Sequence, residues 1–168
     1  MTAATAATAR PPADAPAAPD PGGGFDGAHV RVAILGTGFT GLAMVHALKE
    51  AGIQDWVVLE RAREVGGVWR ENTYPGIACD IPSHLYSLSF APNPDWERTF
   101  SSGKQIWEYE ERVARDLNLA ERTCFGEELT DARWDAERCV WQLRTTTMQL
   151  TADVVVDGTG VLTDPVYP

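Results

Sequence analysis

Three glycines and one acidic residue have the spacing that binds a dinucleotide. Gly36, Gly38 and Gly41 come directly after the apolar segment 30–35. In such a turn the first glycine permits a tight bend, the second lets the backbone approach a pyrophosphate, and the third lets the next helix pack closely on the strand. The phosphates would then face unpaired N–H groups at the positive end of that helix. Three glycines also occur in ordinary loops, so the residues that follow must show whether this turn binds a dinucleotide.

The acidic residue is Glu60, which ends the next apolar segment, 56–59, and lies 24 residues after Gly36. This is close to the spacing of roughly 20 residues expected for the acid that binds the adenosine ribose. A carboxylate there accepts hydrogen bonds from both ribose hydroxyls and repels a 2′-phosphate. We therefore expect FAD or NAD, and not NADP, at this site. The adjacent Arg61 could clamp a phosphate, but we expect it to lie in a loop and face solvent.

The elements that must position these residues are a strand, a helix and a second strand. Between the glycine turn and Glu60, apolar residues recur at helical spacing, and Gly52 follows as a helix stop. The repeating residues are Leu42, Val45, Leu48 and Ala51. The sequence therefore predicts a β–α–β unit with a parallel sheet, in a Rossmann-like α/β fold.

The second half of the sequence predicts another helix and a small β-meander. Residues 102–105 fit a capping box, and the apolar face that follows contains Ile106, Val113 and Leu117, with Tyr109 beside it. We expect Trp107 either in the core or, as the alternative, on a surface that binds a partner. The positions expected to be solvated are Glu108, Glu110, Glu111, Arg112 and Arg115. Strand-like runs occur around Leu129, at 139–144 and at 154–156, while 81–90 predicts a short strand or an extended segment.

Composition limits the class of protein. The chain has 168 residues, enough for one domain, and a net charge of −10, which argues against nucleic acid or an anionic membrane as a partner. The three cysteines have irregular spacing and no CxxC pair, so we expect reduced thiols and a cytoplasmic location. No apolar run is long enough to predict a membrane span. Residues 1–28 are dominated by Ala, Pro, Thr and Gly and predict a disordered tail before a domain over 29–168.

Five segments resemble the N-terminal part of the class B flavoprotein monooxygenases, which include the Baeyer–Villiger and flavin-containing monooxygenases. They are GTGFTG, VVLER, GGVW, TYPGIACDIPSHLYSLSF and VVDGTG. The resemblance covers about residues 30–168 and is most specific to the Baeyer–Villiger branch. It implies an FAD-binding domain of an NADPH-dependent enzyme. In such an enzyme a peroxyflavin formed with molecular oxygen inserts oxygen beside the carbonyl of a small ketone, or oxidises a heteroatom.

The resemblance also implies roles for individual residues around the cofactor. Those implied to line the FAD pyrophosphate are Gly36, Gly38, Thr40 and Gly41, and Glu60 would bind the adenosine ribose. Gly67, Val68 and Trp69 would follow the ribityl and phosphate region. Tyr86 would contact the flavin, Leu129 would touch the adenine through its backbone, and Gly160 would belong to a second glycine motif that closes over the FAD.

One residue is implied to be catalytic. Asp80 matches an aspartate that stands beside the flavin ring and the nicotinamide in the family, where it pairs with an active-site arginine. Ala78 and Cys79 would flank the approach of the nicotinamide, although Cys79 is also typical of a small buried residue without reactivity.

Members of the family continue for several hundred residues beyond the position of Pro168. This sequence has no second GxGxxG for NADPH and no counterpart of the catalytic arginine. We therefore expect a fragment or a truncated gene product that is unable to complete the monooxygenase cycle alone. A non-catalytic truncated product remains an alternative, as does another FAD- or NAD-dependent oxidoreductase. Cys79 has no near partner for a disulfide reductase, and an NAD dehydrogenase would not explain the GGVW and YPG segments.

Overall fold

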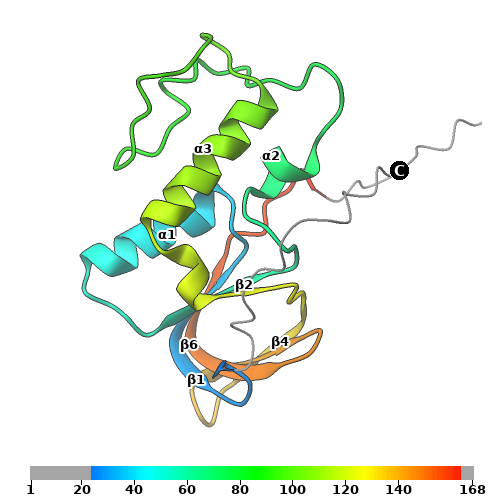
Figure 1. Ribbon diagram of the computed structural model, residues 1–168. Coiled ribbons are helices and arrows are strands. Elements are labelled where there is room, and N and C mark those ends of the chain that lie inside the picture. The colour runs from blue at the N-terminus through cyan, green and yellow to red at the C-terminus, as the bar shows by residue number, and fades with distance from the viewer. Residues whose placement is uncertain (1–23, 164–168) are drawn as a thin grey trace, which may run out of the picture.

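A six-stranded mixed sheet forms the centre of the computed structural model, which describes residues 24–163 (Figure 1). The strands are β1 His29–Leu35, β2 Trp56–Glu60, β3 Thr123–Phe125, β4 Leu129–Asp135, β5 Val140–Thr145 and β6 Gln149–Asp157. Their order in the sheet is β3-β2-β1-β6-β5-β4. The pairs among β3, β2, β1 and β6 are parallel, whereas β5 and β4 continue the sheet in antiparallel pairs. The predicted Rossmann-like β–α–β unit and the small β-meander are both confirmed.

Helices cover one face of the parallel strands. They are α1 Phe39–Glu50, α2 Gly67–Glu71 and α3 Gly103–Asp116, followed by a 3₁₀ turn at Leu119–Arg122. Figure 1 shows α1 and α3 together on this face, and α3 also packs against α2. The main core lies between these helices and the side chains of one face of β1 and β2. A second apolar cluster occupies the opposite face and joins β1 and β2 to β3, β5 and β6.

The sequence of β2 reads as a continuous apolar run because the strand is buried on both faces, as is usual for parallel sheets. Its alternate residues divide between the two clusters: Val58 packs below the helices, and Val57 and Leu59 pack on the other side. Burial on both sides fixes the end of β2, and therefore Glu60, firmly against the end of β1.

Helix α3 begins where the sequence predicts. The side chain of Ser102 caps it by accepting a hydrogen bond from the Gln105 backbone N–H at 3.4 Å. Ile106, Tyr109 and Val113 are buried as expected.

One expectation for α3 is wrong, because Glu110 is only 1% exposed. It lies four residues after Ile106 and three before Val113, so helical geometry places it on the apolar face despite its charge.

The connection between α2 and α3 contains turns, and no strand is found over residues 81–90. Its shape is set by contacts to other parts of the chain. The Tyr109 hydroxyl accepts from the Leu88 N–H at 2.8 Å and donates to the Ala91 carbonyl at 2.9 Å. The Ser83 hydroxyl pairs with the Ser101 hydroxyl at 2.8 Å. The Tyr109 bonds pin the connection to α3, and the Ser83–Ser101 bond joins its two ends, so Tyr86 between them is held in place.

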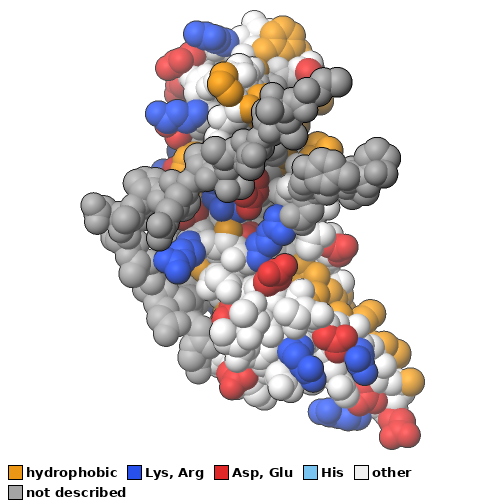
Figure 2. Space-filling view, turned by 90° about the vertical axis from the view of Figure 1, so that its right-hand side faces the viewer, with side chains coloured by type: hydrophobic (Ala, Val, Ile, Leu, Met, Phe, Trp, Pro, Cys, Tyr) orange, Lys and Arg blue, Asp and Glu red, His pale blue; other side chains and the backbone are white. Residues whose placement is uncertain are grey.

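The expected N-terminal tail falls mostly on residues 1–23, which lie outside the described residues. Residues 24–28 are ordered against β6, so the expectation of disorder does not hold for them. The Gly27 N–H donates to the Gln149 carbonyl at 2.7 Å, and the Gln149 N–H donates to the Asp26 carboxylate at 3.0 Å. Among the described residues, no helix is long and apolar enough to cross a membrane. On the face shown in Figure 2, Lys and Arg side chains are spread among acidic and apolar ones.

Candidate functional site

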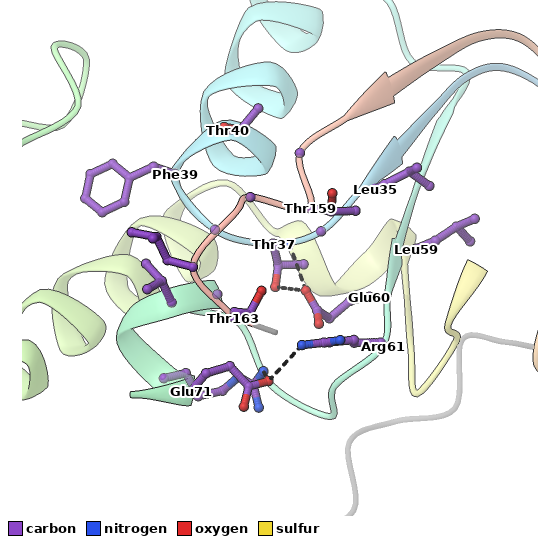
Figure 3. Close-up of a pocket in the computed structure, with 18 of the residues that line it drawn as sticks. Leu35, Thr37, Phe39, Thr40, Leu59, Glu60, Arg61, Glu71, Thr159 and Thr163 are labelled. Atoms are coloured by element: carbon purple, nitrogen blue, oxygen red, sulfur yellow. Dashed lines mark hydrogen bonds and ion pairs between the residues drawn. The ribbon is translucent and has the colours of Figure 1, made fainter. Parts of the chain in front are cut away.

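A pocket of about 710 Å³ opens at the carboxyl ends of β1, β2 and β6, where α1 begins. Open parallel sheets bind ligands in this crevice, beside the point where the chain connections leave in opposite directions. The glycine turn, the end of β2, α2 and residues 158–163 form its wall (Figure 3).

The three glycines of the turn serve different purposes. Gly36 has a φ of 90°, and a Cβ atom there would lie 2.8 Å from the Gly158 carbonyl oxygen. A Cβ atom on Gly41 would overlap the carbonyl oxygen of Gly36, so this glycine lets α1 start directly against the turn. Gly38 has an ordinary φ of −76°, and the nearest atom to its added Cβ would be the Gly67 Cα at 3.7 Å. The fold therefore requires Gly36 and Gly41 but not Gly38.

The start of α1 has the properties of an anion site. No side chain caps its N-terminus by a hydrogen bond, and its first turn contains no acidic residue. The first N–H groups of a helix have no partner within the helix, and they carry the positive end of its dipole. Because the backbones of Gly38 and Gly67 come together here, both loops offer a surface free of side chains to a phosphate group.

Glu60 is 5% exposed and already makes three hydrogen bonds. Its Oε2 accepts from the N–H and the hydroxyl of Thr37 at 2.8 and 2.6 Å, and its Oε1 accepts from the Ala62 N–H at 2.8 Å. Figure 3 shows the Thr37 and Glu60 side chains turned toward each other. A carboxylate has about four acceptor positions. With three in use, the geometry leaves Oε1 free to accept one hydroxyl rather than two.

The pocket brings together most of the residues that the sequence singled out. Those in its lining are Gly36, Gly38, Thr40, Glu60, Gly67, Val68, Tyr86, Leu129 and Gly160. Gly41 lies behind the turn and supports it. Trp69 stands one contact away, since its Nε1 donates to the Tyr86 hydroxyl at 3.1 Å.

The segment predicted to carry the chemistry lies outside this lining. Ala78 and Asp80 are exposed, and Cys79 is buried in the main core, where its N–H donates to the Ser101 carbonyl at 3.0 Å. The nearest link from this segment to the pocket is Tyr86. Burial is the main cause that raises the pKa of the Tyr86 hydroxyl. The Trp69 hydrogen bond opposes it, and electrostatic interactions with Cys79, Glu110 and, last, Asp80 add to it.

Several polar residues line or adjoin the pocket although the sequence did not predict them there. Arg61 is exposed as expected, but it also lines the pocket, and its guanidinium lies 3.9 Å from a Glu71 oxygen (Figure 3). Arg70 donates to the same Glu71 oxygen at 2.6 Å. Thr37 could have been suspected from its place inside the glycine turn, where a hydroxyl can meet the acid at the end of β2.

Glu127 lines the pocket beside Glu60. Its carboxylate accepts hydrogen bonds from the hydroxyls of Thr145 and Thr147 and from the Thr147 N–H. Burial alone would raise the pKa of Glu127, but these hydrogen bonds together lower it. Its N–H also donates to the Glu60 carbonyl at 2.9 Å, which ties the two acids into one wall.

Comparisons with known proteins show which families this chain is similar to. The family model of the NAD(P)-binding Rossmann-like domain matches residues 34–102. A Baeyer–Villiger monooxygenase of Streptomyces coelicolor is 54% identical over 140 residues, which are 83% of this chain and 27% of that protein. An FAD-binding monooxygenase of Aspergillus terreus is 36% identical over 152 residues, covering 86% of this chain and 27% of its own length.

The solved structure of an oxidised steroid monooxygenase bound to NADP is also similar. It superimposes with a TM-score of 0.78 and 32% sequence identity over 83% of this chain and 28% of that one. The chain thus spans little more than a quarter of the length of the curated relatives that it matches.

Proposed function

We propose that this chain, which belongs by homology to the Baeyer–Villiger-type, FAD-binding monooxygenases, provides the FAD pocket of an NADPH-dependent monooxygenase. The observation that carries the proposal is the pocket itself. A side-chain-free cradle at the start of α1 lies beside a buried acid at the end of β2. This pair of features matches the pyrophosphate and the adenosine ribose of a dinucleotide.

The residues present fit FAD along the whole pocket. The N–H groups at the start of α1, with Gly38 and Gly67, would hold the pyrophosphate. Oε1 of Glu60 would accept one ribose hydroxyl, and Leu129 would lie beside the adenine. Val68 and Tyr86 would lie on the flavin side.

When bound, FAD supplies the electron transfer and the reaction with oxygen, and the protein supplies position, charge and exclusion of water. The name of the Streptomyces relative supports a ketone as the substrate of the complete enzyme, with a heteroatom compound as the alternative. The steroid monooxygenase supports NADP as the second cofactor. For Asp80 we propose a role beside the flavin and the nicotinamide. Its exposed position leaves it accessible to a group that approaches from outside this chain.

Flavin binding by the purified chain tests the proposal. We expect a yellow protein whose released ligand has the mass of FAD, or an apoprotein that takes up added FAD. Glu60→Ala should weaken FAD binding about tenfold or more, since a hydrogen bond to a charged group contributes roughly 1.5–3 kcal/mol. A folded protein that binds NAD but no flavin would overturn the proposal in favour of another oxidoreductase.

A further inference from the structure

One acidic side chain in the pocket has no structural explanation so far. Glu110 projects from α3, is 1% exposed, and lines the same pocket as Glu60. Neither of its carboxylate oxygens has a hydrogen-bond partner among the described residues. Burying a polar group without a partner costs free energy, and proteins rarely leave such a group unpaired without a reason. An acid of this kind, directed into a ligand pocket, indicates a contact that a ligand completes.

The groups that face Glu110 do not satisfy it. Arg70 of α2 is the cation whose charge acts on it, but its Nη2 donates to Glu71, and its Nε is itself buried without a hydrogen-bond partner among the described residues. Tyr86 from the connecting segment and Tyr109 from α3 also lie within its electrostatic reach. Burial raises the pKa of Glu110 to about 9, and the charge of Arg70 opposes this only in part. At neutral pH the group is therefore a carboxylic acid that can donate one hydrogen bond and accept another.

Glu110 lies on the side of the glycine turn away from the adenosine end. Glu60 and Leu129 mark the adenosine end of the pocket. Phe39, on the other side of the turn in Figure 3, packs against Tyr86 with ring centroids 4.9 Å apart, and Tyr86 lines the same pocket as Glu110 and lies within its electrostatic reach. A dinucleotide with its pyrophosphate at the start of α1 would therefore extend its second half toward Glu110.

We propose that Glu110 is a ligand of the second half of the bound dinucleotide and hydrogen-bonds a hydroxyl of the polyol chain between the phosphates and the flavin ring. A hydroxyl donates and accepts, so it can satisfy both oxygens of a carboxylic acid. The inference rests on the proposed function, because only a flavin dinucleotide has this open-chain polyol. Arg70 acts as the positioning neighbour that limits the cost of the buried acid.

Calorimetric titration of the purified chain with FAD and, separately, with ADP tests this role. ADP carries only the half that we assign to Glu60 and the glycine turn. Glu110→Leu should weaken FAD binding about tenfold and leave ADP binding unchanged. A tenfold change in Kd corresponds to a loss of roughly 1.4 kcal/mol of binding free energy. Glu110→Gln, which can still donate and accept, should keep FAD binding within about threefold of the wild type. Glu108→Leu, the same change at an exposed position of α3, is the matched control and should alter neither.

The outcomes separate this inference from the proposed function. If Glu110→Leu binds FAD as tightly as the wild type, the inference is wrong while the flavin pocket stands. An equal loss of FAD and ADP in Glu110→Leu would also overturn it, because that pattern reports damage to the fold. If the wild type binds neither FAD nor ADP, the proposed function fails, and the inference fails with it.

Discussion

At the scale of single residues, Glu60 at the end of β2 holds Thr37 in place and, in our proposal, also accepts a ribose hydroxyl. Sequence spacing alone predicted where Glu60 would lie, because the distance from the glycine turn is set by one helix and one strand. The spacing could not reveal that Thr37 uses two of its acceptor positions. These bonds orient the carboxylate before any ligand arrives, which reduces the ordering cost of binding.

Replacing the Thr37 hydroxyl tests how much this orientation contributes to stability. Thr37→Val keeps the shape of a fully buried side chain but removes the donor that lies 2.6 Å from Glu60. Because the acceptor is charged and buried, we expect the free energy of unfolding to fall by about 1.5–3 kcal/mol in urea titrations. Thr130→Val, which removes an exposed hydroxyl bonded to the Arg144 carbonyl, should change it by about 0.5 kcal/mol or less. Equal effects of the two substitutions would contradict this view of Thr37.

Glu110 shows where residue-level reading fails. We expected Glu110 to be solvated because of its charge, although its spacing from Ile106 and Val113 is that of the apolar face. The side chain is buried, and within the described part of the chain its carboxylate has no hydrogen-bond partner in the pocket. A charged residue at an apolar position of a helix could have indicated a functional role for Glu110, because sequences most often break local rules at functional sites.

At the scale of elements, local periodicity determined how much could be predicted. β1 and β2 are nearly continuous apolar runs, α1 and α3 have apolar residues at helical spacing, and Gly52 and Ser102 mark where α1 ends and α3 begins. β3 has only three residues, too few to show a repeat. The connection between α2 and α3 takes its shape from Ser83 and from Tyr109, which is distant in sequence, so local patterns could not predict its turns.

The turn between β1 and α1 offers a test at this scale. Gly38 has an ordinary φ and room for a methyl group, so Gly38→Ala should keep the free energy of unfolding within about 1 kcal/mol of the wild type. The methyl group would nevertheless occupy the phosphate cradle, and we expect ADP and FAD to bind at least about tenfold more weakly.

Gly36→Ala is the informative comparison. Its Cβ would meet the Gly158 carbonyl oxygen at 2.8 Å in a backbone with a φ of 90°, so this variant should lose stability as well as binding. Thermal unfolding and calorimetric titration of both variants would show the difference. If Gly38→Ala binds ADP and FAD as tightly as the wild type, the turn does not contact the phosphates.

At the scale of the whole molecule, the sheet order explains why acids from distant parts of the chain meet in one pocket. β1 lies between β2 and β6, so the turn after β1, Glu60 at the end of β2 and the glycine segment after β6 share one edge of the sheet. α3, packed on α1 and α2, brings Glu110 to the same place from the helical layer. The acids that line this pocket make its charge state, and therefore the stability of the fold, dependent on pH.

Glu127 and Glu110 should affect stability in opposite ways. The lowered pKa of Glu127 means that its contribution is present above the ordinary value of about 4.5 and is lost as the pH falls through its folded-state value. The raised pKa of Glu110 means that the folded state keeps a proton that the unfolded chain has released. Its contribution is therefore fully present below about pH 4.5 and is lost as the pH rises toward about 9.

Comparing the wild type with Glu110→Gln isolates this effect, because the amide does not titrate. Between about pH 5 and about pH 9, the free energy of unfolding of the wild type should fall steadily relative to the variant. Each unit of pKa difference corresponds to about 1.4 kcal/mol, so the change over this range should reach several kcal/mol. Urea titrations of both proteins across the range measure it, and parallel curves would show that Glu110 is not held as a buried acid. Because Glu110→Gln should bind FAD within about threefold of the wild type, saturating FAD should raise both curves by nearly the same amount and change their separation at neutral pH by less than about 1 kcal/mol.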